Sequence, residues 1–137
     1  MSGKYQFSKR SLDNMSHVHR DLRALCYKVL ETDLFDFGIT SGYRDSDEQN
    51  RYFDEGRSAK QFPDSMHNKK PSMAIDILLY VDGKPIWDRT NGFYMAIGVF
   101  RGVAATMGID IRVGADWDGD FSTTDQKFHD LFHIELR

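Results

Sequence analysis

Two segments of the chain carry apolar residues at helical spacing. The first predicts an amphipathic helix over residues 16–31, with an apolar face made of Val18, Leu22, Leu25 and Val29. The second predicts a helix over residues 93–107, ended by Gly108, with apolar positions at Phe93, Ile97, Phe100, Ala104 and Met107. Between them, Ser46 and Gln49 form a capping-box pattern. This pattern predicts a short helix over residues 47–55 that stops at Gly56.

Four further segments have the apolar character and the length of β-strands. They are residues 37–41, 73–81, 109–113 and 132–136. Asp82 and Gly83 follow the second of them and give a strong turn signal. Polar loops over residues 57–72 and 114–127 separate the elements. The pattern predicts an α+β fold, in which helices pack against a small, largely antiparallel sheet.

The composition fits one compact unit. The chain has 137 residues, of which 40% are hydrophobic, and no repeat or linker divides it. We therefore expect a single domain over residues 1–137. The formal net charge of −3 argues against a broad phosphate-binding surface, so no nucleic acid is expected as a partner. The single cysteine, Cys26, excludes an internal disulfide and is expected to be a buried structural thiol.

The amino-terminal segment lacks the apolar core of a signal peptide. The longest purely apolar run, residues 77–81, is far too short to cross a membrane. We therefore expect synthesis in the cytoplasm without insertion into a membrane. A substrate outside the cytoplasm would require another component to carry the protein there.

One charged residue stands out because it interrupts an apolar strand. Asp76 lies within the sequence MAIDILLYV, where an ionised carboxylate is costly unless it is paired or binds a metal. An outward-facing position on an edge strand, or hydrogen bonds to the backbone, would explain Asp76 equally well. The residue alone therefore leaves both interpretations open.

Two histidines favour the metal. Taken singly, His67 in the loop before this strand and His133 in the last strand would be ordinary polar residues. Together with Asp76 they give three nitrogen and oxygen ligands, the set typical of a catalytic zinc site with an open position for water. Asp130, three residues before His133, could accept a proton from that water, or could be a solvated loop residue.

Four pieces of the sequence, in order, resemble one family. SGYRDSDEQ, SMHNKKPSMAID, GADWD and HDLFHIEL are similar to segments of the M15 family of zinc D,D- and L,D-peptidases, and most to phage L-alanyl-D-glutamate endopeptidases used as endolysins. The resemblance extends over about residues 36–136. It implies the Hedgehog/D,D-peptidase-like fold. The nine-residue separation of His67 and Asp76 is longer than in many members of the family.

The resemblance also implies roles for individual residues. His67, Asp76 and His133 become the zinc ligands, and Asp130 takes the place of the catalytic carboxylate. Arg44 matches an arginine that lines the substrate site, where it could stabilise the oxyanion. The alternative for Arg44 is a surface ion pair with Asp45 or Asp47.

Other residues near these segments are candidates for contact with substrate or with the ligands. Ser65 belongs to the segment that carries the first histidine, and Trp117 could pack at the edge of the site or bind substrate. His129 precedes Asp130 and could touch substrate, although a surface role fits it as well. Glu135 should share a strand face with His133 and could be its hydrogen-bond partner.

Three acidic residues alternate in the second polar loop. Asp116, Asp118 and Asp120 could wrap a calcium ion, as some phage members of the family do in this region, or could form a plain polar loop. The full EF-hand pattern is absent. Calcium is therefore a candidate second cofactor beside zinc.

The function implied by the resemblance is hydrolysis of the L-Ala–D-Glu bond in the peptidoglycan stem peptide. One alternative is a D-Ala–D-Ala carboxypeptidase or dipeptidase with the same site. The other is a non-enzymatic, zinc-containing binding or virion-structural module. We expect a monomeric phage endolysin without a separate cell-wall-binding module, which a holin admits to the periplasm and cell wall of its host.

Overall fold

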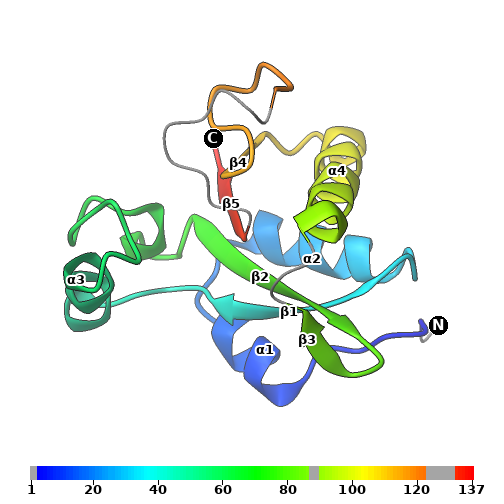
Figure 1. Ribbon diagram of the computed structural model, residues 1–137, viewed down its shortest axis with the longest axis horizontal. Coiled ribbons are helices and arrows are strands. Elements are labelled where there is room, and N and C mark those ends of the chain that lie inside the picture. The colour runs from blue at the N-terminus through cyan, green and yellow to red at the C-terminus, as the bar shows by residue number, and fades with distance from the viewer. Residues whose placement is uncertain (1–2, 87–89, 123–131) are drawn as a thin grey trace.

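The computed structural model describes residues 3–86, 90–122 and 132–137. The expectations for His129 and Asp130 therefore lie outside the described residues. Five antiparallel strands form one sheet, in the order β1-β2-β5-β4, with β3 paired to β2. The strands are β1 (Asp36–Ser41), β2 (Ala74–Val81), β3 (Lys84–Ile86), β4 (Ile111–Val113) and β5 (His133–Leu136). The expected α+β architecture with a small antiparallel sheet is confirmed (Figure 1).

The register of the strands gives the sheet two different faces. On one face, Ile39 lies beside Ile77, and Ile75 lies beside Ile134. These side chains are buried and pack against the apolar faces of α2 (Arg20–Leu30) and α4 (Thr90–Met107). Because side chains alternate along a strand, the residues between them point to the opposite face. That opposite face carries Asp76.

The first expected helix differs from the prediction at its start. Residues 16–31 contain α2, which begins only at Arg20, because the His19 side chain caps it by accepting a hydrogen bond from Asp21 N. Val18 instead pairs with Ser72 in an isolated bridge. An additional helix, α1 (Lys9–Met15), packs on β1 and was not predicted. Its short sequence offers too few apolar residues to show a helical period.

The helix α3 (Ser46–Asp54) begins one residue earlier than expected. Its cap is Asp45, whose carboxylate accepts from Glu48 N, so the predicted capping role of Ser46 is wrong. Gln49 is fully buried and bonds elsewhere. The helix projects from the sheet at the end of the molecule away from α4 (Figure 1). Gly56 ends it with a positive φ of 73°, as expected.

The turn at Asp82 and Gly83 is confirmed, and both residues have positive φ. It joins β2 to β3, a short strand that the sequence did not reveal. The loop over residues 57–72 contains a 3₁₀ helix, η1 (Met66–Asn68), which the prediction also missed. Cys26 is buried in the core, where burial raises the pKa of its thiol, as expected of a structural residue. Within the described ranges, no helix is both long and apolar enough to cross a membrane.

Candidate metal centre

Three neighbouring strands bring polar residues into one row on the face opposite the core. Asp76 on β2 lies directly beside Ser41 on β1 and His133 on β5. A shift in the β1 register between Ile39 and Ser41 aligns Ser41 with Asp76. Ser41 and His133 are far apart in the sequence. The register of the strands places both of them beside Asp76.

The 3₁₀ helix η1 supplies His67. The Ser65 side chain caps it by accepting from His67 N, and the Asn68 side chain accepts from Ser65 N. The candidate residue Ser65 thus holds the backbone beside His67. The His67 residue is only 1% exposed. A short capped turn, rather than a flexible loop, presents this imidazole to the row on the sheet.

The two ring nitrogens of His67 have different roles. Nδ1 lies 2.7 Å from the Gly42 carbonyl oxygen, which can only accept, so Nδ1 carries the proton. Nε2 therefore keeps its lone pair and lies 3.4 Å from Asp76 Oδ1. Position 42 requires a glycine, because the Cβ of any other residue would lie 2.1 Å from the Asn14 carbonyl oxygen. This close packing against α1 fixes the acceptor that orients His67.

His133 is oriented in the same way by a carboxylate. Its Nε2 lies 2.7 Å from Glu135 Oε1, and its Nδ1 lies 3.3 Å from Asp76 Oδ1. Arg112 on β4 binds the other oxygen of Glu135 through Nη2 at 2.8 Å and Nε at 3.2 Å. The expected contact between Glu135 and His133 is therefore present. Arg112 was not among the residues predicted for the site, and it is the last member of this series of contacts.

The two histidines and the aspartate form a group suited to a cation. One ligand atom from each of His67, Asp76 and His133 lies within 4.8 Å of the others. His67 Nε2 and Asp76 Oδ1 are buried without a hydrogen-bond partner. A buried polar atom without a partner is destabilising, and a metal ion would satisfy both atoms. Two imidazoles and one carboxylate, with no thiolate, are the donor set of a catalytic zinc site.

The charge on Asp76 fits a ligand. Burial opposes its ionisation, but the electrostatic effect of the two facing histidines, His67 and His133, outweighs it. They hold the pKa of Asp76 well below its usual range. Likewise, burial is outweighed at Glu135 by His133 and Arg112, which lower the pKa of that carboxyl. Both carboxylates are therefore ionised over the neutral range, as a metal centre requires.

Arg44 lies in the interior, beside the centre. The residue is 7% exposed, and its Nη2 donates to Asp76 Oδ2. The alternative of a surface ion pair with Asp45 or Asp47 is therefore wrong. Trp117 lies at the edge of the site, with its ring centre 5.2 Å from that of His133. This position agrees with the expected packing of the indole at the site.

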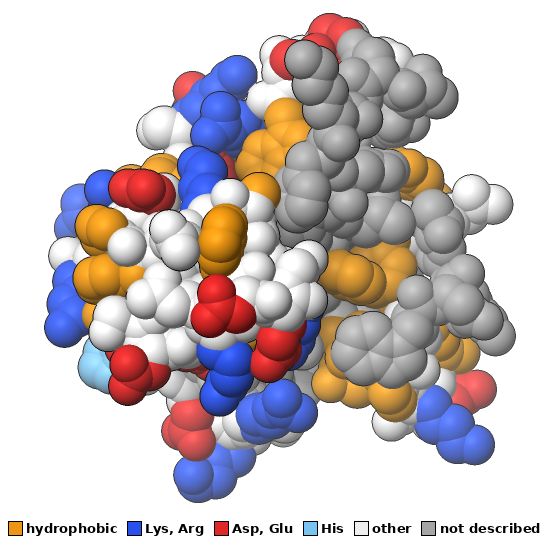
Figure 2. All heavy atoms as spheres, turned by 60° about the vertical axis from the view of Figure 1, so that its left-hand side comes forward, with side chains coloured by type: hydrophobic (Ala, Val, Ile, Leu, Met, Phe, Trp, Pro, Cys, Tyr) orange, Lys and Arg blue, Asp and Glu red, His pale blue; other side chains and the backbone are white. Residues whose placement is uncertain are grey.

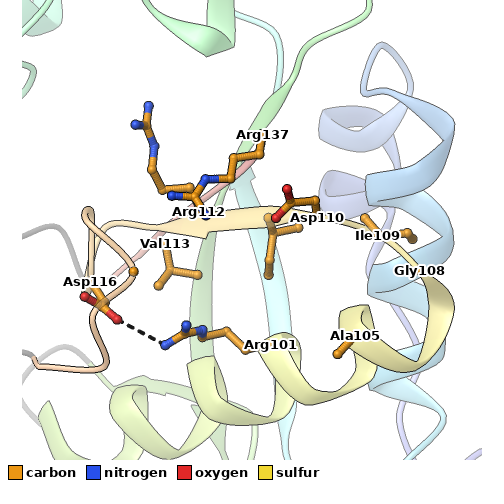
Figure 3. A pocket seen from close by; sticks show the side chains of 11 residues that line it. Arg101, Ala105, Gly108, Ile109, Asp110, Arg112, Val113, Asp116 and Arg137 are labelled. Carbon is orange, nitrogen blue, oxygen red and sulfur yellow. Dashed lines mark hydrogen bonds and ion pairs between the residues drawn. The ribbon is translucent and has the colours of Figure 1, made fainter.

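The acidic loop borders a separate pocket of about 400 Å³ on the side of β4 and α4 (Figure 3). Asp116 is 3% exposed, and its Oδ2 accepts from Arg101 Nη1 at 3.2 Å. Its Oδ1 is buried without a partner. Asp118 and Asp120 are exposed, and their carboxylate oxygens come within 4.8 Å of that of Asp116. Three carboxylates of this loop therefore lie close together, and one of their oxygens, Asp116 Oδ1, has no hydrogen-bond partner.

The surface around α3 carries no single sign of charge on the face drawn in Figure 2. Lysine and arginine side chains alternate there with aspartate and glutamate. A surface that binds nucleic acid would concentrate basic side chains along one stripe. On this face the basic side chains form no such stripe.

Comparisons with known proteins identify the family and support the fold. The profile of the family described as phage L-alanyl-D-glutamate peptidase matches residues 1–137. The L-alanyl-D-glutamate peptidase of Escherichia phage T5 is 28% identical over 135 residues, covering 96% of this chain and 98% of the relative. The crystal structure of the Serratia marcescens L-Ala D-Glu endopeptidase ChiX superposes with a TM-score of 0.77 at 22% identity. That superposition covers 98% of this chain and 92% of the other, and so supports the fold.

Proposed function

Because the chain belongs to the phage L-alanyl-D-glutamate peptidase family, we propose that it cleaves the L-Ala–D-Glu bond of the stem peptide at the centre of His67, Asp76 and His133. The family establishes a peptidase that acts on peptidoglycan. The single observation that supports this location is the convergence of three ligand atoms, two of them buried and unpartnered.

Zinc is the metal that this donor set fits best. His67 would bind through Nε2, His133 through Nδ1 and Asp76 through Oδ1, since these are the atoms that face one another within the group. Three protein ligands leave a position open, as in catalytic zinc sites. When bound, zinc would supply a Lewis acid that polarises the scissile carbonyl and makes water a stronger nucleophile.

The proton transfers are assigned to Asp130. It precedes His133 by three residues and takes the place of the family's catalytic carboxylate. Asp130 accepts a proton as water attacks the L-Ala carbonyl carbon. It then delivers a proton to the D-Glu nitrogen as the carbon–nitrogen bond breaks. His129 stands next to it in the sequence and is a candidate for contact with substrate.

The residues around His133 keep it ready for ligation. Glu135 accepts from Nε2 and so fixes the tautomer that carries its proton on Nε2. Arg112 holds Glu135 with two hydrogen bonds and lies 5.6 Å from the centre of the Trp117 ring. Trp117 in turn packs beside the His133 ring. These residues prepare the ligand but do not touch the reacting bond.

Calcium is the second proposed cofactor, bound by Asp116, Asp118 and Asp120. The unsatisfied, buried Oδ1 of Asp116 supports this assignment, because three carboxylate oxygens around one point suit a hard cation. The ion would stabilise the loop that carries Trp117. It would thereby act on the zinc centre through the contact of Trp117 with His133.

We place the site of action at the bacterial cell wall during phage lysis, with access from the cytoplasm provided by a holin. The proposed active form is a monomer, since all proposed ligands come from one chain. These points follow from the family's role as endolysins.

Digestion of purified peptidoglycan, followed by mass spectrometry, tests the proposed bond. Cleavage at L-Ala–D-Glu releases peptides with a new D-Glu amino terminus and leaves L-Ala on the glycan strand. Release of free D-Ala instead would identify a D,D-carboxypeptidase. If the zinc-loaded protein cleaves no bond, a binding module is favoured instead. The His133→Ala variant is the control and should be inactive.

A further inference from the structure

The buried Arg44 side chain makes contacts that its expected role at the oxyanion does not explain. Its guanidinium donates from three nitrogens, to the acceptors Ser41 Oγ, Gln49 Oε1 and Asp76 Oδ2. The Nε contact to Ser41 measures 2.8 Å, and the longer Nη1 contact to Gln49 measures 3.4 Å. Each nitrogen therefore has an acceptor within the protein. The guanidinium is held in one orientation.

The Asp76 contact decides which oxygen of that carboxylate can bind a metal. Arg44 takes Oδ2, whereas Oδ1 faces His67 and His133 without a hydrogen-bond partner. An arginine on one oxygen favours ligation through the other oxygen alone. Arg44 thus sets both the position of the carboxylate and the number of oxygens that it offers.

The backbone of Arg44 is joined to the second ligand. Its N–H donates to the His67 carbonyl oxygen at 2.9 Å, and its own carbonyl oxygen accepts from Asn68 Nδ2 at 3.1 Å. The turn that presents His67 is therefore anchored on Arg44. One residue connects the two ligands that come from β2 and from η1.

A hydrogen-bonded support holds the far side of Arg44. The guanidinium lies 4.4 Å from the centre of the Tyr52 ring on α3. Gln49, also on α3, is fully buried and donates to Ser58 Oγ at 2.9 Å and to the Lys60 carbonyl oxygen at 2.7 Å. These bonds fix α3 and the following loop against Arg44. The helix α3 therefore serves as a rigid base for the guanidinium.

We propose that Arg44 is a positioning residue for the metal ligands, holding Asp76 through its side chain and the His67 turn through its backbone. The proposal rests on the zinc centre of the proposed function. It replaces the expected oxyanion role, which would require the guanidinium to point to the substrate carbonyl. The two roles differ in what they control. A positioning residue controls the affinity and geometry of the metal, whereas an oxyanion group controls turnover alone.

Arg44→Gln separates these roles, because it removes the charged fork and keeps a polar side chain. The zinc dissociation constant is measured by competition with a chromophoric chelator, and Co²⁺ absorption reports the ligand geometry. We expect zinc affinity to fall by about 10–100-fold, with a changed Co²⁺ spectrum. Arg57→Gln is the matched control, because Arg57 lies 4.2 Å from the same Tyr52 ring and contacts no ligand. Its zinc affinity should equal that of the wild type.

Two milder variants test the same proposal if Arg44→Gln does not fold. Arg44→Lys retains the charge but loses the fork, and Ser41→Ala removes only the acceptor of Nε. Both should weaken zinc, Arg44→Lys by about tenfold and Ser41→Ala by less. One result would overturn the proposal and restore the oxyanion role. In it, every folded Arg44 variant keeps the wild-type zinc affinity and Co²⁺ spectrum, and only turnover at saturating zinc is reduced. A wild-type chain that binds no zinc would instead refute the proposed metal centre itself, and the positioning role with it.

Discussion

At the scale of single residues, the proposed centre depends on which nitrogen of each histidine faces Asp76. A backbone carbonyl selects Nε2 of His67, and the carboxylate of Glu135 selects Nδ1 of His133. The two histidines thus use different ring nitrogens toward Asp76 Oδ1. The ligands are prepared before a metal arrives, which lowers the cost of binding.

Glu135→Gln should weaken zinc, because the amide cannot provide the negative charge that holds the Nε2 proton. We expect a loss of affinity of about tenfold, measured by chelator competition. Glu31→Gln, at an exposed glutamate beside α2, is the control and should bind zinc normally. Unchanged affinity in Glu135→Gln would mean that the charge of Glu135 is not needed to orient His133.

The same variant should alter the dependence of stability on pH. Since the pKa of Glu135 is lower in the folded chain than its ordinary value of 4.5, the unfolded chain takes up the proton first. The stabilisation is present above pH 4.5 and is lost as the pH falls toward the folded pKa. Denaturant unfolding of the zinc-free chain should therefore show a steeper decline below pH 4.5 in the wild type than in Glu135→Gln. Equal slopes would contradict the lowered pKa.

Asp130→Asn tests the proposed base. The substitution keeps size and hydrogen bonding but removes basicity, and the three metal ligands remain. Turnover should fall by about 100-fold or more, the usual value of a positioned acid–base group, while zinc content stays at the wild-type level. Near-normal turnover would exclude Asp130 as the base, and loss of zinc together with turnover would make it a ligand.

At the scale of elements, short and tightly packed segments present the ligands. The turn η1, the first residues of β2 and the beginning of β5 each deliver one. The helix α1 supports this arrangement from outside, because its Asn14 carbonyl packs against Gly42. The position of a helix that carries no ligand therefore affects the orientation of His67.

Gly42→Ala should disturb this packing. The new methyl group would overlap the Asn14 carbonyl oxygen, so the neighbouring backbone must move, at a cost of about 1–3 kcal/mol in the free energy of unfolding. Gly98→Ala, at an exposed helical site with no atom within 4 Å of the new Cβ, should instead be neutral or stabilising by up to about 1 kcal/mol. Thermal unfolding of both variants measures the difference. Equal stability would show that the backbone at Gly42 yields without cost.

The acidic loop should bind calcium directly. Isothermal titration of zinc-loaded protein is expected to give one site with a dissociation constant of about 10⁻⁴–10⁻³ M, the range of extracellular modules. Asp116→Asn should abolish the heat because it neutralises the buried carboxylate with the unsatisfied oxygen. Asp47→Asn, at an exposed acidic residue of α3, should bind as the wild type does. A wild-type chain that gives no heat at millimolar calcium would refute the site.

At the scale of the whole molecule, the sequence predicted the elements better than their arrangement. Hydrophobic periodicity and glycine stops located α4, and the Asp82-Gly83 turn was correct. The short elements α1, β3 and η1 were missed, because seven helical residues, one 3₁₀ turn or three strand residues are too few to display a period. The strand register that sets Asp76 beside His133 depends on contacts distant in the sequence, and no local pattern predicts it.

The supporting residues were the least predictable part of the site. Gln49 was interpreted as a capping residue, whereas it is a buried partner of the Arg44 guanidinium. Arg112 lies on a short strand of alternating residues and gave no chemical signal of its own. Such residues acquire their role only when the fold brings them beside a ligand. Family resemblance predicts the ligands, but the structure is needed to find what holds them.

The most direct test of the account measures zinc content and bond cleavage in one titration. The metal is removed by a chelator, zinc is added back in known steps, and peptides with a new D-Glu amino terminus are counted at each step. The account predicts that cleavage rises in proportion to bound zinc and saturates at one ion per chain, and that His133→Ala gains neither zinc nor activity. Full cleavage by the zinc-free chain, or by a His133→Ala variant without zinc, would contradict it.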